Sequence, residues 1–172
     1  LGGALTDLGG NTNWQKEITR LAITQNHNFT MNGGTDNLTY YASIGALNQE
    51  GIIRNNNLKR VTGRINLTQK ALNGKLKIDY NLNVTNSLSD RPNIETLIGS
   101  AISLNPTYSA KDLAGNPTVF SDVENPLITL KLYSDKTETN RIIANISPSY
   151  EIIKGLTYKL NFGIDRSNAD QD

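Results

Sequence analysis

Hydrophobic and polar residues alternate along the segment 58–85. Because the side chains of a β-strand point alternately to opposite faces, this period of two predicts strands with one apolar and one polar face. Asn73-Gly74 interrupts the alternation, and such a pair supplies the positive φ angles of a tight turn. The segment is therefore predicted to be a long β-hairpin. Its apolar positions are Val61, Gly63, Ile65, Leu67, Leu76, Ile78, Tyr80, Leu82 and Val84.

The same alternation predicts further strands on both sides of the hairpin. Two precede it, at about 24–32 and 38–48, and two follow it, at about 140–152 and 158–165. Pro148 has no N–H group, so it predicts a bulge or a position without a ladder hydrogen bond. The expected fold class is all-β, an antiparallel up-and-down meander of about six long strands, with a long partly helical loop.

The segment 86–138 has no period of two and holds most of the prolines. Asn93 is a predicted N-cap for a helix that ends before Asn105-Pro106, and Asn125-Pro126 predicts a second short helix. Near the start of the chain, Thr12 and Gln15 resemble a capping box for a helix from Trp14 to about Leu21. The predicted organisation is a loop with a short helix (1–23), four strands (24–85), the long loop (86–138) and two strands (139–172).

Strand length and connection length favour a membrane β-barrel over an ordinary sheet. Several predicted strands reach about ten residues, whereas strands of globular proteins average about five or six. Transmembrane β-strands need about 9–11 residues, and outer-membrane barrels alternate short periplasmic turns with long extracellular loops. Short connections at 33–37, 71–75 and 153–155 alternate here with long ones at 49–57 and 86–138. About six strands cannot close such a barrel, so the chain is expected to be part of a transmembrane β-barrel.

Composition adds few constraints. A formal net charge of +1 gives no reason to expect a nucleic-acid partner, and the absence of cysteine excludes disulfides. No run of residues approaches the roughly 18–20 apolar residues of a transmembrane helix. The chain starts at Leu1 without a charged and then apolar leader, so it is expected to be processed or a piece of a longer protein.

Short segments spread over nearly the whole chain resemble the barrel of SusC/RagA-type TonB-dependent outer-membrane transporters of Bacteroidetes. The resemblance lies in the order of the segments more than in any one of them. They are Trp14-Gln15-Lys16-Glu17-Ile18, residues 25–28 leading into Gly33-Gly34-Thr35, and residues 40–45, 48–52, 60–66, 125–127, 139–141, 155–158 and 161–163.

The resemblance implies a function and a location. It implies part of a TonB-dependent transporter in the bacterial outer membrane, with a barrel of roughly 22 strands around a plug. The substrates implied are oligosaccharides or, in some members, peptides. The partners implied are a SusD-like surface lipoprotein, the TonB complex and outer-membrane lipid. The alternative is a self-contained soluble β-domain that binds a ligand or partner at a bacterial surface.

Two groups of residues are candidates for contact with solutes. The polar positions of the strands fit a water-filled lumen, and the loop aromatics fit contact with substrate or with the lipoprotein. The alternative role for the aromatic residues is to hold the loop together. The lumen candidates are Arg60, Arg64, Lys77, Asp79, Arg141, Asn145, Lys159 and Asp165, and the loop candidates are Tyr108, Phe120 and Tyr133.

The sequence predicts no catalytic, cofactor or metal site, and no enzyme. His27 is the only histidine and lies among the apolar positions of a predicted strand, so it is expected to pack at an interface. Residues 112–116 contain Asp112 and Asn116, but they lack the spacing of a Ca²⁺-binding loop and are predicted to form a turn.

Overall fold

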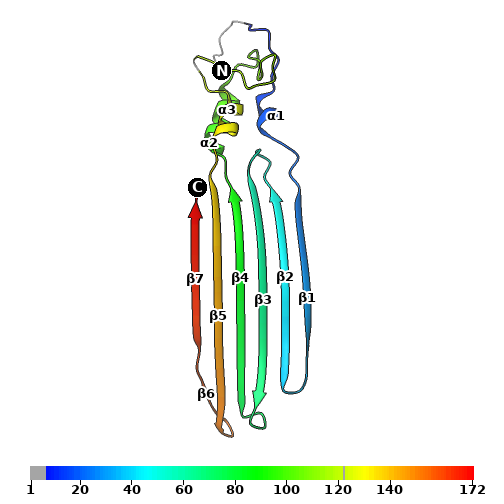
Figure 1. The fold of residues 1–172 in the computed structure, drawn as a ribbon, viewed down its shortest axis with the longest axis vertical. Helices are drawn as coiled ribbons and strands as arrows, with labels where there is room; N and C mark the ends of the chain where they lie inside the picture. The colour runs from blue at the N-terminus through cyan, green and yellow to red at the C-terminus, as the bar shows by residue number, and fades with distance from the viewer. Residues whose placement is uncertain (1–6, 122) are drawn as a thin grey trace.

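One antiparallel sheet accounts for most of the protein (Figure 1). The computed structural model describes residues 7–121 and 123–172. Its strands follow the order β1-β2-β3-β4-β5-β6, and β7 also pairs with β5. This is the predicted meander of six long strands, the last of which is divided into β6 and β7. The strands are β1 (Thr24–Gly34), β2 (Leu38–Glu50), β3 (Asn57–Ala71), β4 (Leu76–Asp90), β5 (Lys136–Ile153), β6 (Leu156–Lys159) and β7 (Phe162–Gln171).

The short and long connections lie at opposite ends of the sheet (Figure 1). Residues 35–37, 72–75 and 154–155 form the short turns at one end, whereas residues 51–56 and 91–135 lie at the other. The turn between β3 and β4 has the predicted positive φ angles, 55° at Asn73 and 87° at Gly74. Short and long connections therefore alternate along the chain as expected, and this alternation puts them at opposite ends of the sheet.

The strands are longer than the hydrophobic alternation predicted. β4 continues to Asp90 and β5 begins at Lys136, so the connection between them is residues 91–135 rather than 86–138. Paired residues continue from Val84↔Ile142 to Asp90↔Lys136. In most of this extension both faces carry polar side chains. The strands are paired there through their backbones, but the sequence shows almost no alternation of hydrophobic and polar residues.

Pro148 coincides with an interruption in the neighbouring strand. It is opposite Ile78 on β4, while on its other side β6 ends at Lys159 and β7 starts at Phe162. The Pro148 carbonyl accepts a hydrogen bond from the Leu160 N–H at 2.9 Å, but its own nitrogen has no hydrogen to donate. The predicted irregularity at Pro148 is therefore found, and it divides the last strand.

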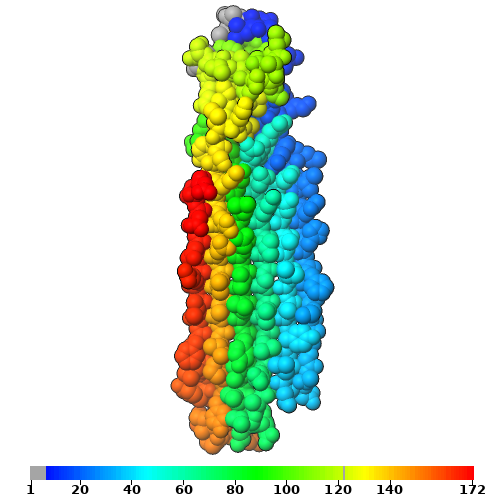
Figure 2. Space-filling model, in the orientation of Figure 1, coloured from blue at the N-terminus to red at the C-terminus, as the bar shows by residue number. Residues whose placement is uncertain are grey.

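Among the described residues, three short helices lie beyond the long-connection end of the sheet (Figure 1). The space-filling view shows the region that contains them as a compact head above the elongated sheet (Figure 2). The helices are α1 (Trp14–Ile18), α2 (Ile94–Ser103) and α3 (Pro126–Leu132). The predicted caps of α2 and α3 are confirmed, because the side-chain oxygens of Asn93 and Asn125 accept backbone hydrogen bonds from Thr96 and Leu127. We call these helices, with the loops around them, the cap.

The predicted capping box at the start of α1 is wrong. Asn13 caps the helix, accepting a hydrogen bond from the Lys16 N–H at 3.0 Å. The Thr12 hydroxyl instead donates to the Tyr108 carbonyl at 2.6 Å. The helix also ends at Ile18 rather than near Leu21, because Thr19 is extended and forms a β-bridge with Ile53.

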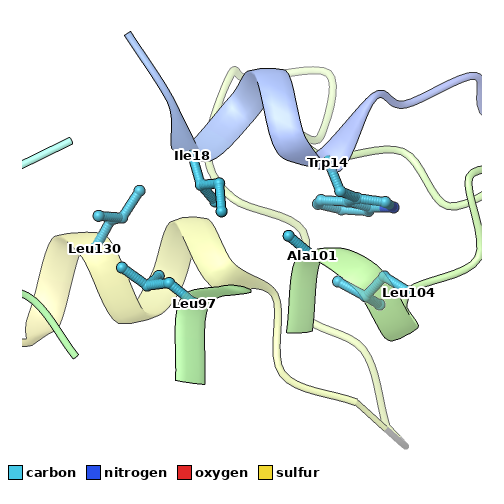
Figure 3. Close-up of a cluster of buried hydrophobic side chains, with 6 residues drawn as sticks. All are labelled: Trp14, Ile18, Leu97, Ala101, Leu104 and Leu130. Carbon is cyan, nitrogen blue, oxygen red and sulfur yellow. The ribbon is translucent and has the colours of Figure 1, made fainter. Parts of the chain in front are cut away.

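The buried hydrophobic side chains of the described residues lie in the cap (Figure 3). Leu97 is fully buried and Trp14 is 3% exposed. Within the described ranges, the helices pack against one another and not against the strands. The sheet consequently has no hydrophobic core of its own. The cap core consists of Trp14, Ile18, Leu97, Ala101, Leu104 and Leu130.

Across residues 7–121 and 123–172, no helix combines the length and the hydropathy needed to cross a bilayer.

Candidate membrane-facing surface and lumen wall

The strand register separates the side chains into two faces. Directly opposed residues of antiparallel strands share a face, so they form rows across the sheet. One such row joins Met31, Ala42, Ile65, Leu82, Ala144 and Ile164, from β1 to β7. The row offset by one residue along the strands joins Thr30, Ser43, Arg64, Asn83, Ile143 and Asp165. We call the first surface the apolar face and the second the polar face.

The apolar face is exposed over its whole width. Phe29 on β1 is 66% exposed, Ile65 on β3 is 50% exposed and Ile164 on β7 is 68% exposed. A water-soluble domain would place such side chains in a core, since a contiguous apolar patch of this kind is unfavourable in water. This surface is therefore suited to an apolar surrounding.

Tyrosine and phenylalanine gather on the apolar face near the short turns. Tyr40, Tyr80 and Phe162 share one row. Tyr150 and Tyr158 oppose each other two rows closer to the turns. Aromatic girdles of this kind mark the membrane–water interface of outer-membrane barrels, because the ring is apolar and the hydroxyl group reaches water.

The apolar face changes to polar side chains near the cap. The row beyond Val84 contains His27, Ala46, Val61, Asn86, Asn140 and Asn168. The Asn86 side-chain amide donates hydrogen bonds of 2.7 Å to Asn140 Oδ1 and to Glu138 Oε1. His27 thus lies at the edge of the apolar band, as expected for a residue at an interface.

The band between these limits has the height of a membrane barrel. It extends from Leu76 to Val84 on β4, which is about 27 Å at about 3.4 Å per residue. A strand tilt of about 35–45° reduces this to roughly 20 Å across the membrane, close to the ~25 Å apolar band of outer-membrane barrels.

All eight residues proposed as lumen candidates lie on the polar face. Arg141 and Asp165 form an ion pair with an Nη2–Oδ2 distance of 2.6 Å, and Lys77 and Asp79 form another at 3.0 Å. The Thr68 hydroxyl donates to Asp79 Oδ1 at 2.7 Å. The other candidates are Arg60, Arg64, Asn145 and Lys159, placed on this face by the rows that contain them.

The polar face also carries a row of amides, of which only Asn145 was among the lumen candidates. Asn66, Asn81 and Asn145 oppose one another on β3, β4 and β5, and Tyr41 extends the row onto β2. One row closer to the short turns, the Ser147 hydroxyl donates to Asn161 Oδ1 at 2.5 Å. The register brings these residues together, and Asn145 joins the row from a strand that is distant in sequence.

The three loop aromatics differ in their surroundings. The Tyr108 and Phe120 rings are 4.4 Å apart between centroids, and Phe120 meets Trp14 edge-on at 6.1 Å. Both pack against the cap core, whereas Tyr133 is 43% exposed after the end of α3. The arrangement gives Tyr108 and Phe120 a packing role and leaves Tyr133 accessible to a ligand or partner.

The cap joins three connections that are separate in sequence. The Arg20 N–H donates to the Ile52 carbonyl at 2.9 Å, which ties the segment before β1 to the β2–β3 connection. The Asn55 side chain donates to the Leu130 carbonyl at 2.7 Å, which ties that connection to α3. Trp14 Nε1 donates to the Asn105 carbonyl at 3.1 Å.

The predicted turn at residues 112–116 is confirmed. Asp112 Oδ1 accepts backbone hydrogen bonds from Ala114 at 2.9 Å and from Asn116 at 2.8 Å. The carboxylate thus closes a turn, as aspartate does in many such loops. Among the described residues, no three His, Cys, Asp or Glu side chains are grouped so that they could hold a metal ion.

These surfaces define the class of protein. The sheet has one exposed apolar face with an aromatic belt, one polar face, long strands and short turns at a single end. Its outer strands β1 and β7 each pair with one neighbour, so the sheet is open. Together these are the features of a segment of a transmembrane β-barrel.

Comparison with known proteins shows which transmembrane β-barrels this chain is similar to. No protein-family model matches the chain. The TonB-dependent receptor SusC of Bacteroides thetaiotaomicron is 30% identical over 170 residues, which cover 84% of this chain and 17% of that receptor. The TonB-dependent receptor P3 of Formosa agariphila is 29% identical, over 92% of this chain and 17% of the receptor. The chain therefore spans about 17% of the length of these relatives.

Solved structures agree on the fold. The RagAB peptide importer in its closed-closed state matches 95% of this chain and 20% of that chain, with a TM-score of 0.78 and 24% identity. The RagAB peptide transporter matches 93% of this chain and 19% of that chain, with a TM-score of 0.76. The chain thus matches a segment of the SusC/RagA-type TonB-dependent receptors of the bacterial outer membrane.

Proposed function

We propose that the chain forms part of the wall of a transporter that imports oligosaccharides or peptides through the outer membrane. The exposed apolar face is the observation that carries the proposal. It crosses every long strand at a common height, so lipid can cover it as a continuous band. In this arrangement the polar face lines the lumen, and the connection 91–135 is extracellular.

The chemistry of the polar face supports a water-filled lumen. It carries arginine, lysine and aspartate at middle depth of the strands, where the opposite face is apolar. Charged side chains at this depth are costly in lipid but are tolerated in a hydrated lumen. A soluble β-domain, the alternative, would have to cover the apolar face, and the described residues place no element over it.

Partners follow from the same proposal. The RagAB relative is a peptide importer, which supports peptides as one substrate class. A SusD-like lipoprotein would meet the cap, where Tyr133 remains accessible. Energy would come from the TonB complex through parts of the protein outside this chain.

Adjacent residues on β3 provide a direct experiment. Arg64→Cys and Ile65→Cys would be made in the full-length transporter, since this chain has no cysteine of its own. We expect Arg64→Cys in isolated outer membranes to react with a small water-soluble maleimide after the lumen is opened with urea. Ile65→Cys should remain unreactive with that reagent and should react with a lipid-soluble one. Matching reactivity of the two cysteines would contradict the proposed orientation.

Substrate class requires a separate measurement. Purified full-length protein, alone and together with the proposed SusD-like lipoprotein, would be tested by calorimetry against mixed oligosaccharides and against mixed peptides. Binding of one class, lost when Tyr133→Ala is introduced, would support transport of that class and contact through the cap. Binding of neither class would contradict the proposed transport.

A further inference from the structure

Small residues leave a hollow in the apolar face. Gly63 on β3 lies between Ile44 on β2 and Val84 on β4, which oppose it directly. A Cβ atom added at Gly63 would meet nothing within 4 Å, so the space above this glycine is open. The hollow has a volume of about 360 Å³, and its other side chains on this face are Phe29, Met31, Ala42, Ile65 and Leu82.

A second hollow, of about 300 Å³, lies closer to the cap and is polar. Ala46 on β2 lies between His27 on β1 and Val61 on β3, which oppose it directly. The other side chains of this face that line the hollow are Gln25, Asn48, Lys59 and Asn86. A third hollow shares Phe29 and Ile44 with the first, and His27, Ala46 and Val61 with the second. The three hollows therefore adjoin, and we call them together the β2 groove.

The β2 groove crosses the limit of the apolar band near the cap. Gly63 belongs to the row of Val84, which is the last row of the band. Lys59 lies four residues away along β3, or about 14 Å at about 3.4 Å per residue. The groove thus continues from apolar side chains to amides and a cation, which matches the order of groups in a lipid from acyl chain to headgroup.

Lys59 has no acidic partner in the groove. Among the described residues, no Asp or Glu lines the groove, and no carboxylate forms an ion pair with Lys59. Glu50 lies in the next row toward the cap, where it pairs with Arg20 at 3.9 Å.

The other carboxylates on the strands of this face lie outside the groove. Asp90, at the cap end of β4, directly opposes Lys136 on β5. Glu138 on β5 accepts a hydrogen bond of 2.7 Å from the Asn86 amide, and Asp170 is on β7. Lys59 is therefore available to an anion that comes from outside the chain.

We propose that the β2 groove binds one phosphorylated lipid of the outer leaflet, with an acyl chain over Gly63 and the phosphate at Lys59. This inference rests on the proposed function, because the apolar face must meet lipid and the cap must be extracellular. Lysine binds phosphate as a point charge, and the amides of Gln25 and Asn48 can donate hydrogen bonds to headgroup oxygens. A basic pocket beside apolar surface is a recurring way to select anionic headgroups.

A larger hollow on the same face provides a comparison. It has a volume of about 920 Å³ and surrounds Ala144, but no charged side chain of the described residues lines it. Acyl chains can cover this hollow whatever headgroup they carry. We expect the β2 groove, in contrast, to distinguish phosphorylated lipids from neutral ones.

Native mass spectrometry of the full-length transporter, freed of lipid in detergent, tests the site. The probes are lipid A with one phosphate, which is an acylated sugar phosphate, the same lipid without its phosphate, and inorganic phosphate alone. We expect the protein to retain severalfold more of the phosphorylated lipid than of the neutral one. Equal retention of the two lipids, or retention of inorganic phosphate and of neither lipid, would overturn the proposal.

Two variants address the two ends of the groove separately. Lys59→Gln removes the cation, and Gly63→Val occupies the hollow without a clash at Cβ, with a residue that strands favour. Each should reduce retention of the phosphorylated lipid severalfold, whereas Lys59→Arg should keep most of it. Lys136→Gln and Ala144→Val are matched controls, because they change a lysine and a small residue of the same face outside the groove.

The controls should leave retention unchanged. Unchanged retention in either Lys59→Gln or Gly63→Val would overturn the proposal. If the cysteines at positions 64 and 65 label as expected while this happens, only the lipid inference fails and the proposed function stands. If the two cysteines react alike, the proposed orientation fails and the lipid inference fails with it.

Discussion

Arg141 and Asp165 are joined by two hydrogen bonds across neighbouring strands, from Nε to Oδ1 at 3.0 Å and from Nη2 to Oδ2 at 2.6 Å. Arg141 opposes Ser167, and Asp165 opposes Ile143, so the pair is diagonal and connects two rows. Both side chains are 51% exposed. The geometry is that of a bidentate pair, but water competes for both groups.

Asp165→Asn should therefore have only a small effect on stability. Exposed ion pairs contribute little, because water and salt screen the charges. We expect the melting temperature of the full-length protein in detergent, followed by circular dichroism, to fall slightly at low salt and hardly at all at high salt. A large fall that salt does not reduce would show that the pair is shielded from water in the complete barrel.

Ile65→Lys should destabilise the barrel much more than Leu88→Lys. Both side chains belong to the apolar face, but Ile65 lies within the band and Leu88 beyond its polar limit. A lysine in the middle of the lipid face costs about 2–4 kcal/mol, and one near the interface about 0–1 kcal/mol. Urea titration of the full-length protein in lipid vesicles measures both values. Equal losses of unfolding free energy in the two variants would mean that the membrane boundary does not lie between Ile65 and Leu88.

Trp14→Ala should loosen the cap without disturbing the sheet. Trp14 is 3% exposed and contacts Phe120, and truncation of a buried tryptophan costs about 3–5 kcal/mol. We expect faster hydrogen exchange in residues 91–135 and unchanged exchange in β3 and β4. Trp14→Phe, which keeps most of the apolar volume, should give an intermediate result. Faster exchange in the strands would mean that the cap supports the sheet.

Asn125→Ala should weaken the cap more than Asn93→Ala does. Both residues are N-caps, but the fully buried Asn125 also donates to the carbonyls of Ala110 and Thr118, at 2.8 and 2.9 Å. Loss of an exposed cap costs about 1 kcal/mol, whereas a part-buried carbonyl left unpaired, here that of Thr118, adds about 1–3 kcal/mol. The Ala110 carbonyl keeps the Thr118 N–H as a donor at 3.0 Å. Proteolysis rates of the cap in the two variants measure the difference, and similar rates would contradict this assignment.

Sequence reasoning predicted the sheet because its hydrophobic pattern is local. A period of two marks each strand between the aromatic belt and the row of Val84, and Asn73-Gly74 marks the turn between β3 and β4. The pattern fades beyond Val84, where Asn86 and Asn140 replace hydrophobic residues on the apolar face. The end of β4 was therefore predicted several residues too early, and the start of β5 several residues too late. Their pairing depends on backbone hydrogen bonds, which leave little trace in residue type.

The arrangement of polar residues across strands could be predicted only in part. Alternation placed Arg64 and Asp79 on the same face, but it could not place Lys70 opposite Lys77 without the register. The cap was harder still, because Thr12 looked like a helix cap and instead bonds to Tyr108. Contacts between residues 90 or more positions apart leave no periodic signal in a single sequence.

The hydrogen bond between Trp14 and Asn105 has a consequence for the order of folding. It joins residues 91 positions apart, and β1 to β4 lie between them along the chain. Closing so long a stretch is entropically costly until the strands have paired and brought its ends together. We expect the cap to consolidate late, after this part of the wall has formed. Burial of Trp14 would then indicate that β1 to β4 have already paired in the correct register.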